Sequence, residues 1–146
     1  MPFAKNRRIH LIQILISPEI GNREMNDLFL SAWNEHKETD FSYLRKNSLA
    51  YICAYQEKKL IGFINIAWDG KKHAFLLDTT VDRRFQHKGV GSKLVRQAID
   101  YAFRIGVEWL HVDYEPALEP FYAACGFRNS KAGIYNLLEH QEEKTI

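Results

Sequence analysis

The sequence has few of the residues that mark several specialised classes of protein. Its 146 residues include two cysteines and four prolines, and Cys53 and Cys125 stand far apart, with no CxxC pair. The six histidines are scattered along the chain. Neither residue type therefore shows the spacing of a metal site. We predict no metal, and two free thiols in a reducing, cytoplasmic compartment.

Long apolar runs are also absent. No stretch approaches the roughly 20 apolar residues that a membrane-spanning helix needs. Residues 1–17 are basic and then apolar, which resembles a signal peptide in outline. The apolar part is short, contains His10 and Gln13, and lacks a small-residue cleavage site. We interpret it as a first β-strand and predict a soluble protein with no membrane partner.

The charge balance argues against a nucleic-acid partner. The net charge is +2, and no dense stripe of lysine and arginine appears. What the chain does have is apolar material, with 46% hydrophobic and 13% aromatic residues. That is enough for the core of one ordinary domain. Because there are no repeats, linkers or low-complexity tracts, we predict a single domain over residues 1–146.

Hydrophobic periodicity predicts elements in the order β-α-α-β-β-β-α-β-α-β. The predicted strands cover residues 8–17, 50–56, 60–70, 73–81, 107–115 and 133–139. The predicted helices cover residues 18–36, 40–47, 89–105 and 118–126. Ser17 is the expected N-cap of the first helix, Thr39 or Asp40 that of the second, and Gly106 ends the third. This order predicts a mixed α/β (α+β) fold, with antiparallel hairpins first and a helical crossover later.

The strongest chemical signal is a glycine-containing loop between the strand at 73–81 and the helix after it. Gly89 and Gly91 let the backbone approach a ligand closely. The first N–H groups of a helix lack partners and lie at the positive end of its dipole, so such a loop suits an anion, most naturally a pyrophosphate. Two commoner nucleotide motifs fail here. No GKS or GKT follows, and Leu94 stands where a dinucleotide loop has its third glycine.

A different template fits. The segment "QHKGVG" at 86–91 resembles the (Q/R)xxGx(G/A) motif of the GNAT superfamily of N-acetyltransferases, and "FYAACGF" at 121–127 resembles its LYxxxGF segment. The resemblance covers roughly residues 50–130. It implies a mostly antiparallel sheet of six to seven strands, splayed between the strands at 73–81 and 107–115. It also implies acetyl-CoA in that opening, with its pantetheine arm near residues 79–81 and its pyrophosphate on the amides of 86–91.

The resemblance assigns cofactor contacts and a catalytic acid. The expected cofactor-binding residues are Thr79, Thr80, Val81, Arg84, Gln86, His87, Lys88, Gly89, Val90, Gly91, Ser92 and Tyr122. Tyr122 takes the position of the tyrosine that protonates the departing CoA thiolate. The structural alternative is a tyrosine packed on a short helix with its hydroxyl at the surface.

The general base is open among three carboxylates, Asp78, Asp113 and Glu115. Asp78 lies in an otherwise apolar strand, where a charge without a partner is costly. A structural carboxylate bound to the loop is the alternative reading. Alternation along the strand at 107–115 puts Asp113 and Glu115 on one face, although both also fit a solvated strand end. We keep Asp78 and Glu115 as catalytic candidates beside Tyr122.

The acceptor is expected to be a primary amine of a small molecule or a peptide. Trp33, Asp113 and Glu115 are the acceptor-binding candidates, because the acidic groups suit a cation and the N-terminal helices of the family border that site. Glu115 departs from the family pattern, since many members carry asparagine seven residues before the tyrosine. A non-catalytic acyl-CoA sensor of the same fold therefore stays as the alternative. Homodimers are common among relatives, so self-association is open as well.

Overall fold

The computed structural model describes residues 11–140, and within them the sheet has five strands in the order β1-β2-β3-β4-β5. The strands are β1 (Ile12–Ile16), β2 (Ser48–Gln56), β3 (Lys59–Trp68), β4 (His73–Val81) and β5 (Trp109–Val112). β1 to β4 pair antiparallel in sequence order, and β5 joins β4 in parallel. The predicted mixed sheet is confirmed.

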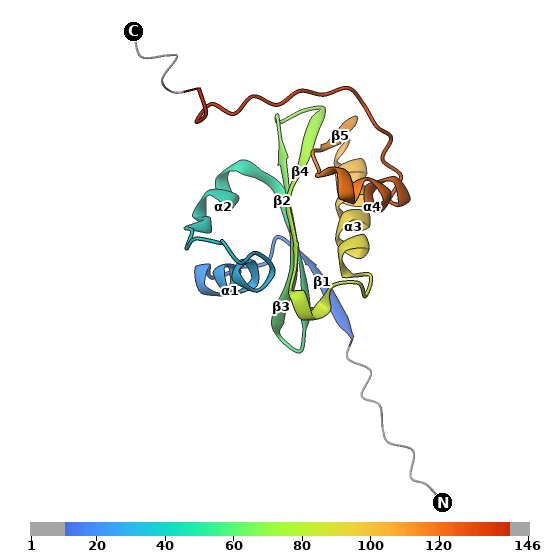
Figure 1. Cartoon of the computed structure of the whole chain (residues 1–146). Helices are drawn as coiled ribbons and strands as arrows, with labels where there is room; N and C mark the ends of the chain where they lie inside the picture. The colour runs from blue at the N-terminus through green and yellow to red at the C-terminus, as the bar shows by residue number, and fades with distance from the viewer. Residues whose placement is uncertain (1–10, 141–146) are drawn as a thin grey trace, which may run out of the picture.

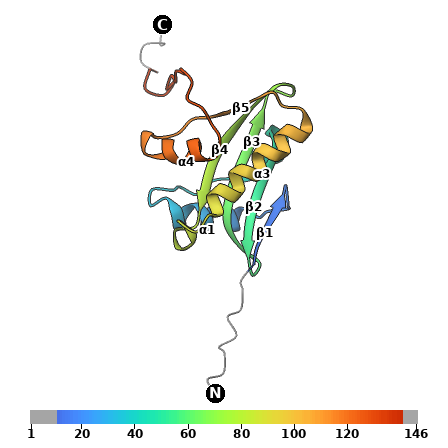
Figure 2. The same cartoon turned by 90° about the vertical axis from the view of Figure 1, so that its right-hand side faces the viewer.

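Helices cover both faces of this sheet (Figure 1). One face carries α1 (Asn22–Ala32), the 3₁₀ turn η1 (Phe41–Tyr43) and α2 (Leu44–Asn47). The other carries α3 (Val90–Ile105) and α4 (Glu119–Ala124), with α3 running along the sheet (Figure 2). Two further 3₁₀ turns, η2 (Arg83–Phe85) and η3 (Pro116–Leu118), precede α3 and α4. None of the helices within residues 11–140 combines the length and the apolar character needed to cross a bilayer.

The predicted final strand at 133–139 is wrong, and so is the count of six to seven strands for the described part of the chain. Residues 127–136 have no regular structure, and residues 137–140 form a turn. Ile134 is 86% exposed and Leu138 74%. An apolar run becomes a strand only where a neighbouring strand accepts its backbone hydrogen bonds. This run extends beyond the sheet (Figure 1).

The first helix is shorter than predicted, and Ser17 does not cap it. α1 begins at Asn22 after Gly21, which makes no side-chain cap bond, and it ends at Ala32. Ser17 instead bonds to β2, because its Oγ accepts a hydrogen bond from the Tyr51 N–H at 3.3 Å. Residues 8–10 of the predicted first strand lie outside the described residues.

The boundaries of the second and third helical segments are well predicted. Asp40 caps η1, because its carboxylate accepts from the Ser42 N–H at 3.0 Å. α3 ends at Gly106, which takes the left-handed conformation with φ 97°.

A tight turn joins β2 to β3, with Glu57 and Lys58 both at positive φ, as the two-residue hairpin turn requires.

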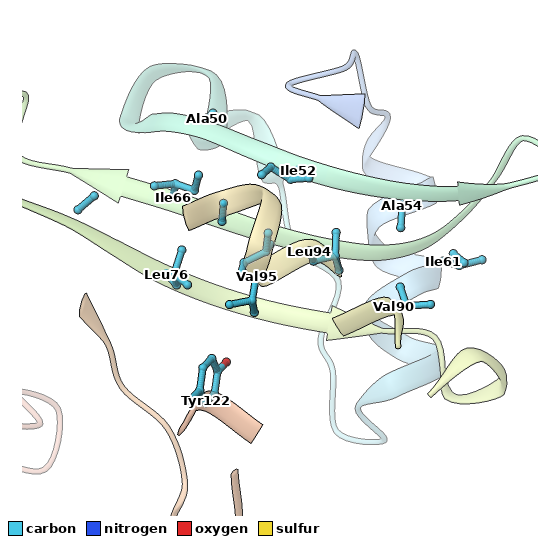
Figure 3. Packing of buried hydrophobic residues seen from close by; sticks show 13 residues of the cluster. Ala50, Ile52, Ala54, Ile61, Ile66, Leu76, Val90, Leu94, Val95 and Tyr122 are labelled. Carbon is cyan, nitrogen blue, oxygen red and sulfur yellow. The ribbon is translucent and has the colours of Figure 1, made fainter. Parts of the chain in front are cut away.

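The core consists of one apolar layer on each face of the sheet. The apolar stripe of α3 includes Val90, Leu94 and Val95 and packs on β2, β3 and β4 (Figure 3). On the opposite face α1 packs against Cys53 and Phe63 of the sheet. Each layer buries the apolar side of an amphipathic helix.

α3 lies close to β3 at Gly62. A Cβ placed on Gly62 would lie 3.0 Å from Leu94 Cδ1 and 3.1 Å from Val90 Cγ1. Both distances are shorter than ordinary carbon contacts. The absence of a side chain at Gly62 therefore sets the depth at which the N-terminal half of α3 rests on the sheet.

The sheet opens between β4 and β5, in agreement with the predicted splay. The two strands pair only from His73 with Trp109 to Leu76 with Val112. β4 then continues to Val81 without β5. This second half of β4 carries a bulge, because residues 78 and 79 together stand opposite Ile64 of β3.

Candidate functional site

The N-terminus of α3 is built to leave backbone donors available. Gly89 is its N-cap, with φ 85° and no side-chain cap bond. An L-residue is strained in this left-handed conformation, whereas glycine adopts it readily. A Cβ on Gly89 would meet nothing within 4 Å, so the loop is open on that side. The first-turn N–H groups and the positive end of the helix dipole together suit an anion.

The loop that leads into α3 is held by two side chains. Asp82 is buried, and its carboxylate accepts from the Arg84 N–H at 2.9 Å and from Arg84 Nη2 at 3.1 Å. Gln86 Nε2 donates to the Val81 carbonyl at 3.0 Å. The glutamine of the sequence motif thus ties the loop to the end of β4. Sequence reasoning missed Asp82, although an aspartate that opens a helical turn is a familiar capping signal.

The structure gathers the remaining predicted loop residues around the start of α3. His87 and Lys88 are exposed, and Lys88 Nζ lies 5.7 Å from the ring centre of Phe85. The Val90 side chain is buried in the core, so Val90 presents only its backbone to the loop. Ser92 is half-buried in the first turn of the helix.

Gly91 marks the place where three elements meet. A Cβ on Gly91 would lie 3.4 Å from Phe121 Cζ of α4 and 3.8 Å from Val81 Cγ2 of β4. The structure therefore brings the two sequence motifs together, since 86–91 and 121–127 lie side by side at the end of β4.

Tyr122 projects from α4 toward β4, with its hydroxyl oxygen on the β4 side of the ring (Figure 3). The hydroxyl donates to Thr79 Oγ1 at 3.3 Å. The side chain is only 4% exposed. A surface position for its hydroxyl, the structural alternative considered from the sequence, does not match this burial.

Three aromatic rings fix the orientation of Tyr122. Tyr114 stacks on it with ring centres 4.8 Å apart, and Phe121 and Phe127 meet it edge-on at 4.9 and 5.8 Å. The Tyr114 hydroxyl donates to Asn129 Oδ1 at 2.6 Å. Sequence reasoning missed Tyr114, because its contact with Tyr122 depends on how α4 packs beside β5.

The bulge in β4 explains how a carboxylate is accommodated in an apolar strand. Asp78 takes a positive φ of 58°, and its side chain is exposed rather than buried with the apolar neighbours. Although solvent reaches this side chain, the surrounding protein atoms partly desolvate it, and this raises the pKa of the Asp78 carboxyl above its usual value.

Residues from the α1 side reach the same bulge. Trp33 Nε1 donates to Thr80 Oγ1 at 3.3 Å, and Thr80 Oγ1 donates to the Asp78 carbonyl at 2.9 Å. Burial raises the pKa of Tyr43, and the negative charge of Asp78 raises it further. Trp33, Tyr43 and Asp78 therefore border the opened half of β4 on the face opposite α3 and α4.

Asp113 and Glu115 do not lie in a strand. β5 ends at Val112, so the predicted strand over 107–115 is too long. The two residues lie in the connection from β5 to η3, and both are exposed. The chain carries them past the last β4–β5 pair, toward the open end of the sheet.

Two histidines that are far apart in the sequence form a pair. His73 Nδ1 and His111 Nε2 lie 3.0 Å apart, and the His111 ring stacks on Phe75 with centres separated by 4.7 Å. The parallel register of β4 and β5 creates this pair, which sequence spacing does not reveal. In the part of the chain that the structure describes, no group of three histidine, cysteine or acidic side chains is arranged to hold a metal ion.

A separate cavity of about 470 Å³ lies between α1 and the β2–β3 turn. Its lining includes Glu24, Asp27 and Asp82 beside Lys58, Lys59 and Arg84, and it does not include Tyr122 or the glycines of the loop. Acidic and basic side chains stand on its wall in similar numbers, so its charge gives no preference for a phosphate. The open end of β4 therefore remains the candidate site.

Known proteins resemble this chain in sequence and in fold. Residues 17–127 match the model of the Acetyltransferase (GNAT) family. Glucosamine 6-phosphate N-acetyltransferase 1 of Oryza sativa subsp. japonica is 33% identical over 60 residues, which are 40% of this chain and 36% of that protein. Streptothricin acetyltransferase A of Bacillus subtilis (strain 168) is 32% identical over 68 residues, 47% of this chain and 39% of that protein.

Each of these two matches spans less than half of the relative's length. Among solved structures, an aminoglycoside N-acetyltransferase in complex with CoA superposes with a TM-score of 0.67. That superposition covers 86% of this chain and 93% of the other, at 18% identity. At this identity the likeness is one of fold.

Proposed function

Because the chain belongs to the acetyltransferase (GNAT) family, as the match over residues 17–127 shows, we propose that it transfers the acetyl group of acetyl-CoA to a primary amine. One observation carries this proposal. The hydroxyl of the buried Tyr122 lies 3.3 Å from Thr79 Oγ1. Thr79 belongs to the part of β4 that no longer pairs with β5 and that leads toward the start of α3. The names of the relatives refer to glucosamine 6-phosphate, streptothricin and aminoglycosides. They favour a small-molecule acceptor over a peptide.

The loop residues fit acetyl-CoA as co-substrate. Gly89 leaves open space where a side chain would stand, and its φ of 85° presents the first-turn amides of α3. We propose that these amides hold the pyrophosphate, with the exposed Lys88 and His87 near the other phosphate groups. The main chain of Thr79 to Val81 has no β5 partner, so it can pair with the amide groups of the pantetheine arm.

The chemical step needs a neutral amine, because a free alkylamine has a pKa of about 10 and is mostly protonated at neutral pH. We assign the removal of a proton to Asp78, directly or through water. Desolvation raises the pKa of this carboxyl, which makes Asp78 a better proton acceptor than an ordinary aspartate. Trp33 and Tyr43 border the same bulge and are proposed to contact the acceptor.

Acetyl transfer forms a C–N bond to the amine and breaks the C–S bond of the thioester. The amine nitrogen attacks the thioester carbonyl carbon, and a backbone N–H near Val81 stabilises the developing oxyanion. The C–S bond breaks, and the thiolate sulfur takes the proton of the Tyr122 hydroxyl. Asp78 returns the proton of the ammonium group to solvent before the attack. It then takes the extra proton of the attacking nitrogen and passes it through solvent to the Tyr122 oxygen. The products are an N-acetylated amine and CoA.

A two-part experiment tests the proposal. Acetyl-CoA should raise the melting temperature of the protein by mass action. Release of the CoA thiol is then followed with a panel that includes glucosamine 6-phosphate, an aminoglycoside, a polyamine and a peptide amine, against a control without amine. A rise in melting temperature together with amine-dependent release of the CoA thiol supports the proposed acetyltransferase activity. A rise in melting temperature without thiol release in the presence of any amine favours the non-catalytic acyl-CoA sensor, the alternative that the glutamate at position 115 suggests. An unchanged melting temperature contradicts both functions.

A further inference from the structure

The cavity between α1 and the β2–β3 turn lies apart from the candidate site, and the proposed acetyl transfer makes no use of it. Its volume of about 470 Å³ is in the range of small-molecule sites. Its two walls come from different parts of the fold. One wall is a face of α1, and the other is the β2–β3 turn together with Asp82 and Arg84.

The α1 wall is acidic. Glu24, Asp27 and Ser31 all line the cavity, because a helix brings positions three, four and seven apart onto one face. Both carboxylates are exposed. Ser31 Oγ donates to the Leu28 carbonyl at 2.7 Å, and the same oxygen can still accept from a donor. This wall therefore suits an ammonium group.

The opposite wall has a net positive charge. It carries Lys58, Lys59 and Arg84 against Glu57 and Asp82. Asp82 is buried, and its carboxylate accepts from Arg84 Nη2 at 3.1 Å and lies 3.9 Å from Lys59 Nζ. Asp82 thus holds the Arg84 guanidinium in place, while this group keeps further N–H donors for a ligand. The wall therefore suits a carboxylate.

The two walls do not neutralise each other directly. Among residues 11–140, neither Glu24 nor Asp27 forms an ion pair with a cation of the other wall. Opposite charges therefore face each other across the open space of the cavity. A bound molecule with a cationic end and an anionic end satisfies both walls, whereas a molecule with one charge also meets a wall of like charge, which is unfavourable.

The size of the cavity sets the length of such a molecule. A sphere of the same volume is about 10 Å across. An α-amino acid carries both of its charges around one carbon atom, so it is too short to reach both walls. A dipeptide extends over about 7 Å, which leaves room for a hydrogen bond at each end. Leu28 and Leu60 also line the cavity, so one apolar side chain fits beside them.

We propose that this cavity is a second ligand site, which binds a short peptide with both termini charged, of the length of a dipeptide. The amino terminus of the peptide lies against the acidic face of α1, and its carboxylate lies against Lys58 and Arg84. The argument rests on the walls of the cavity and does not depend on the proposed acetyl transfer.

An NMR titration of the full chain with leucylglycine tests the site. The backbone amide signals of residues 24–31 and 57–60 should shift together as the peptide is added. N-acetyl-leucylglycine lacks the cationic end and leucylglycinamide lacks the anionic end, so each should bind about tenfold more weakly or worse. Leucylglycine that leaves both segments unshifted at millimolar concentration overturns the proposal, and so does equal affinity for the three peptides.

Variants that remove one charge check where the peptide binds. Asp27→Asn and Lys58→Gln should each raise the Kd for leucylglycine about threefold or more. Asp100→Asn and Arg104→Gln are the matched controls, because these exposed residues pair with each other at 2.6 Å on α3, on the other face of the sheet. Their Kd should equal that of the wild type. A Kd that rises in Asp78→Asn but not in Asp27→Asn or Lys58→Gln would place the peptide at the candidate site and overturn the proposal.

Discussion

The hydroxyls of Tyr122 and Thr79 lie 3.3 Å apart, although the two residues are 43 positions apart in the chain. One comes from α4 and the other from the bulge of β4. Their contact places a buried, well-packed tyrosine hydroxyl beside the half of β4 that β5 does not pair. The candidate acid and the opening of the sheet therefore belong to one site.

The two glycines that bound α3 allow a matched test of the anion site. Gly89 and Gly106 both have left-handed φ angles, 85° and 97°, and an added Cβ meets nothing within 4 Å at either position. Alanine at either position should lower the free energy of unfolding by about 1–2 kcal/mol, because an L-residue is strained there. Only Gly89→Ala should also weaken CoA binding, since its methyl group enters the space assigned to the pyrophosphate.

Calorimetric titration with CoA and urea unfolding of both variants check this prediction. Gly106→Ala serves as the control for stability, because it lies at the far end of the same helix. Equal CoA affinity in the two variants would mean that the loop is not the phosphate site.

Replacing Asp78 by asparagine should stabilise the protein at neutral pH. Partial desolvation raises the folded-state pKa of the Asp78 carboxyl above its usual value, so the ionised carboxylate is disfavoured in the folded protein. The stability that the protonated Asp78 carboxyl contributes is fully present below its pKa in the unfolded chain. This stability is lost as the pH rises through its pKa in the folded protein. Asparagine never ionises, and it tolerates positive φ better than most residues.

The stability gain of Asp78→Asn should therefore shrink toward acidic pH, which melting temperatures at acidic and neutral pH would reveal. The same variant should lose turnover if Asp78 is the base. A melting-temperature difference that is the same at both pH values would show that titration of Asp78 is not its cause.

Overpacking at Gly62 should loosen α3 from the sheet. A Cβ at this position would come within 3.0 Å of Leu94 Cδ1 and 3.1 Å of Val90 Cγ1, so Gly62→Ala is expected to lower the free energy of unfolding by about 1–3 kcal/mol. Urea unfolding measures the change. Gly133→Ala is the control, because a Cβ there meets nothing within 4 Å, and a similar loss in both variants would refute the packing argument.

The two cysteines should differ in reactivity. Both are free thiols; Cys53 is buried and Cys125 is only partly buried. Burial raises the pKa of the Cys53 thiol, so little reactive thiolate forms there. A thiol reagent should therefore modify Cys125 in the native protein and reach Cys53 only after denaturation, as peptide mass spectrometry can show. Equal rates at both sites in the native state would contradict the buried position of Cys53.

The sequence predicts those features of the site that depend on local spacing. Gly89 and Gly91 stand at fixed positions before a helix, and Tyr122 stands at a fixed position before Gly126, so the two motifs are readable without the fold. Their proximity was expected only through the family resemblance. The structure shows it through Gly91, whose missing side chain leaves room for Phe121.

Features that depend on strand register or on packing between distant segments cannot be predicted from the sequence. A charge at Asp78 in an apolar strand looked costly, and the bulge that turns it toward solvent arises from pairing with β3. The stacking of Tyr114 on Tyr122 depends on how α4 packs beside β5. The strand predicted at 133–139 failed for the same kind of reason, because apolar pattern is local whereas a strand needs a partner.

The most direct test of the central claim compares two tyrosine variants at saturating acetyl-CoA, with an amine that supports turnover. Tyr122→Phe removes the proposed acid, so kcat should fall by about a hundredfold or more, while the Kd for acetyl-CoA stays unchanged. Tyr114→Phe keeps the stacked ring and loses only the hydroxyl that donates to Asn129, so its kcat should stay near the wild-type value. A Tyr122→Phe enzyme with wild-type kcat would contradict the account.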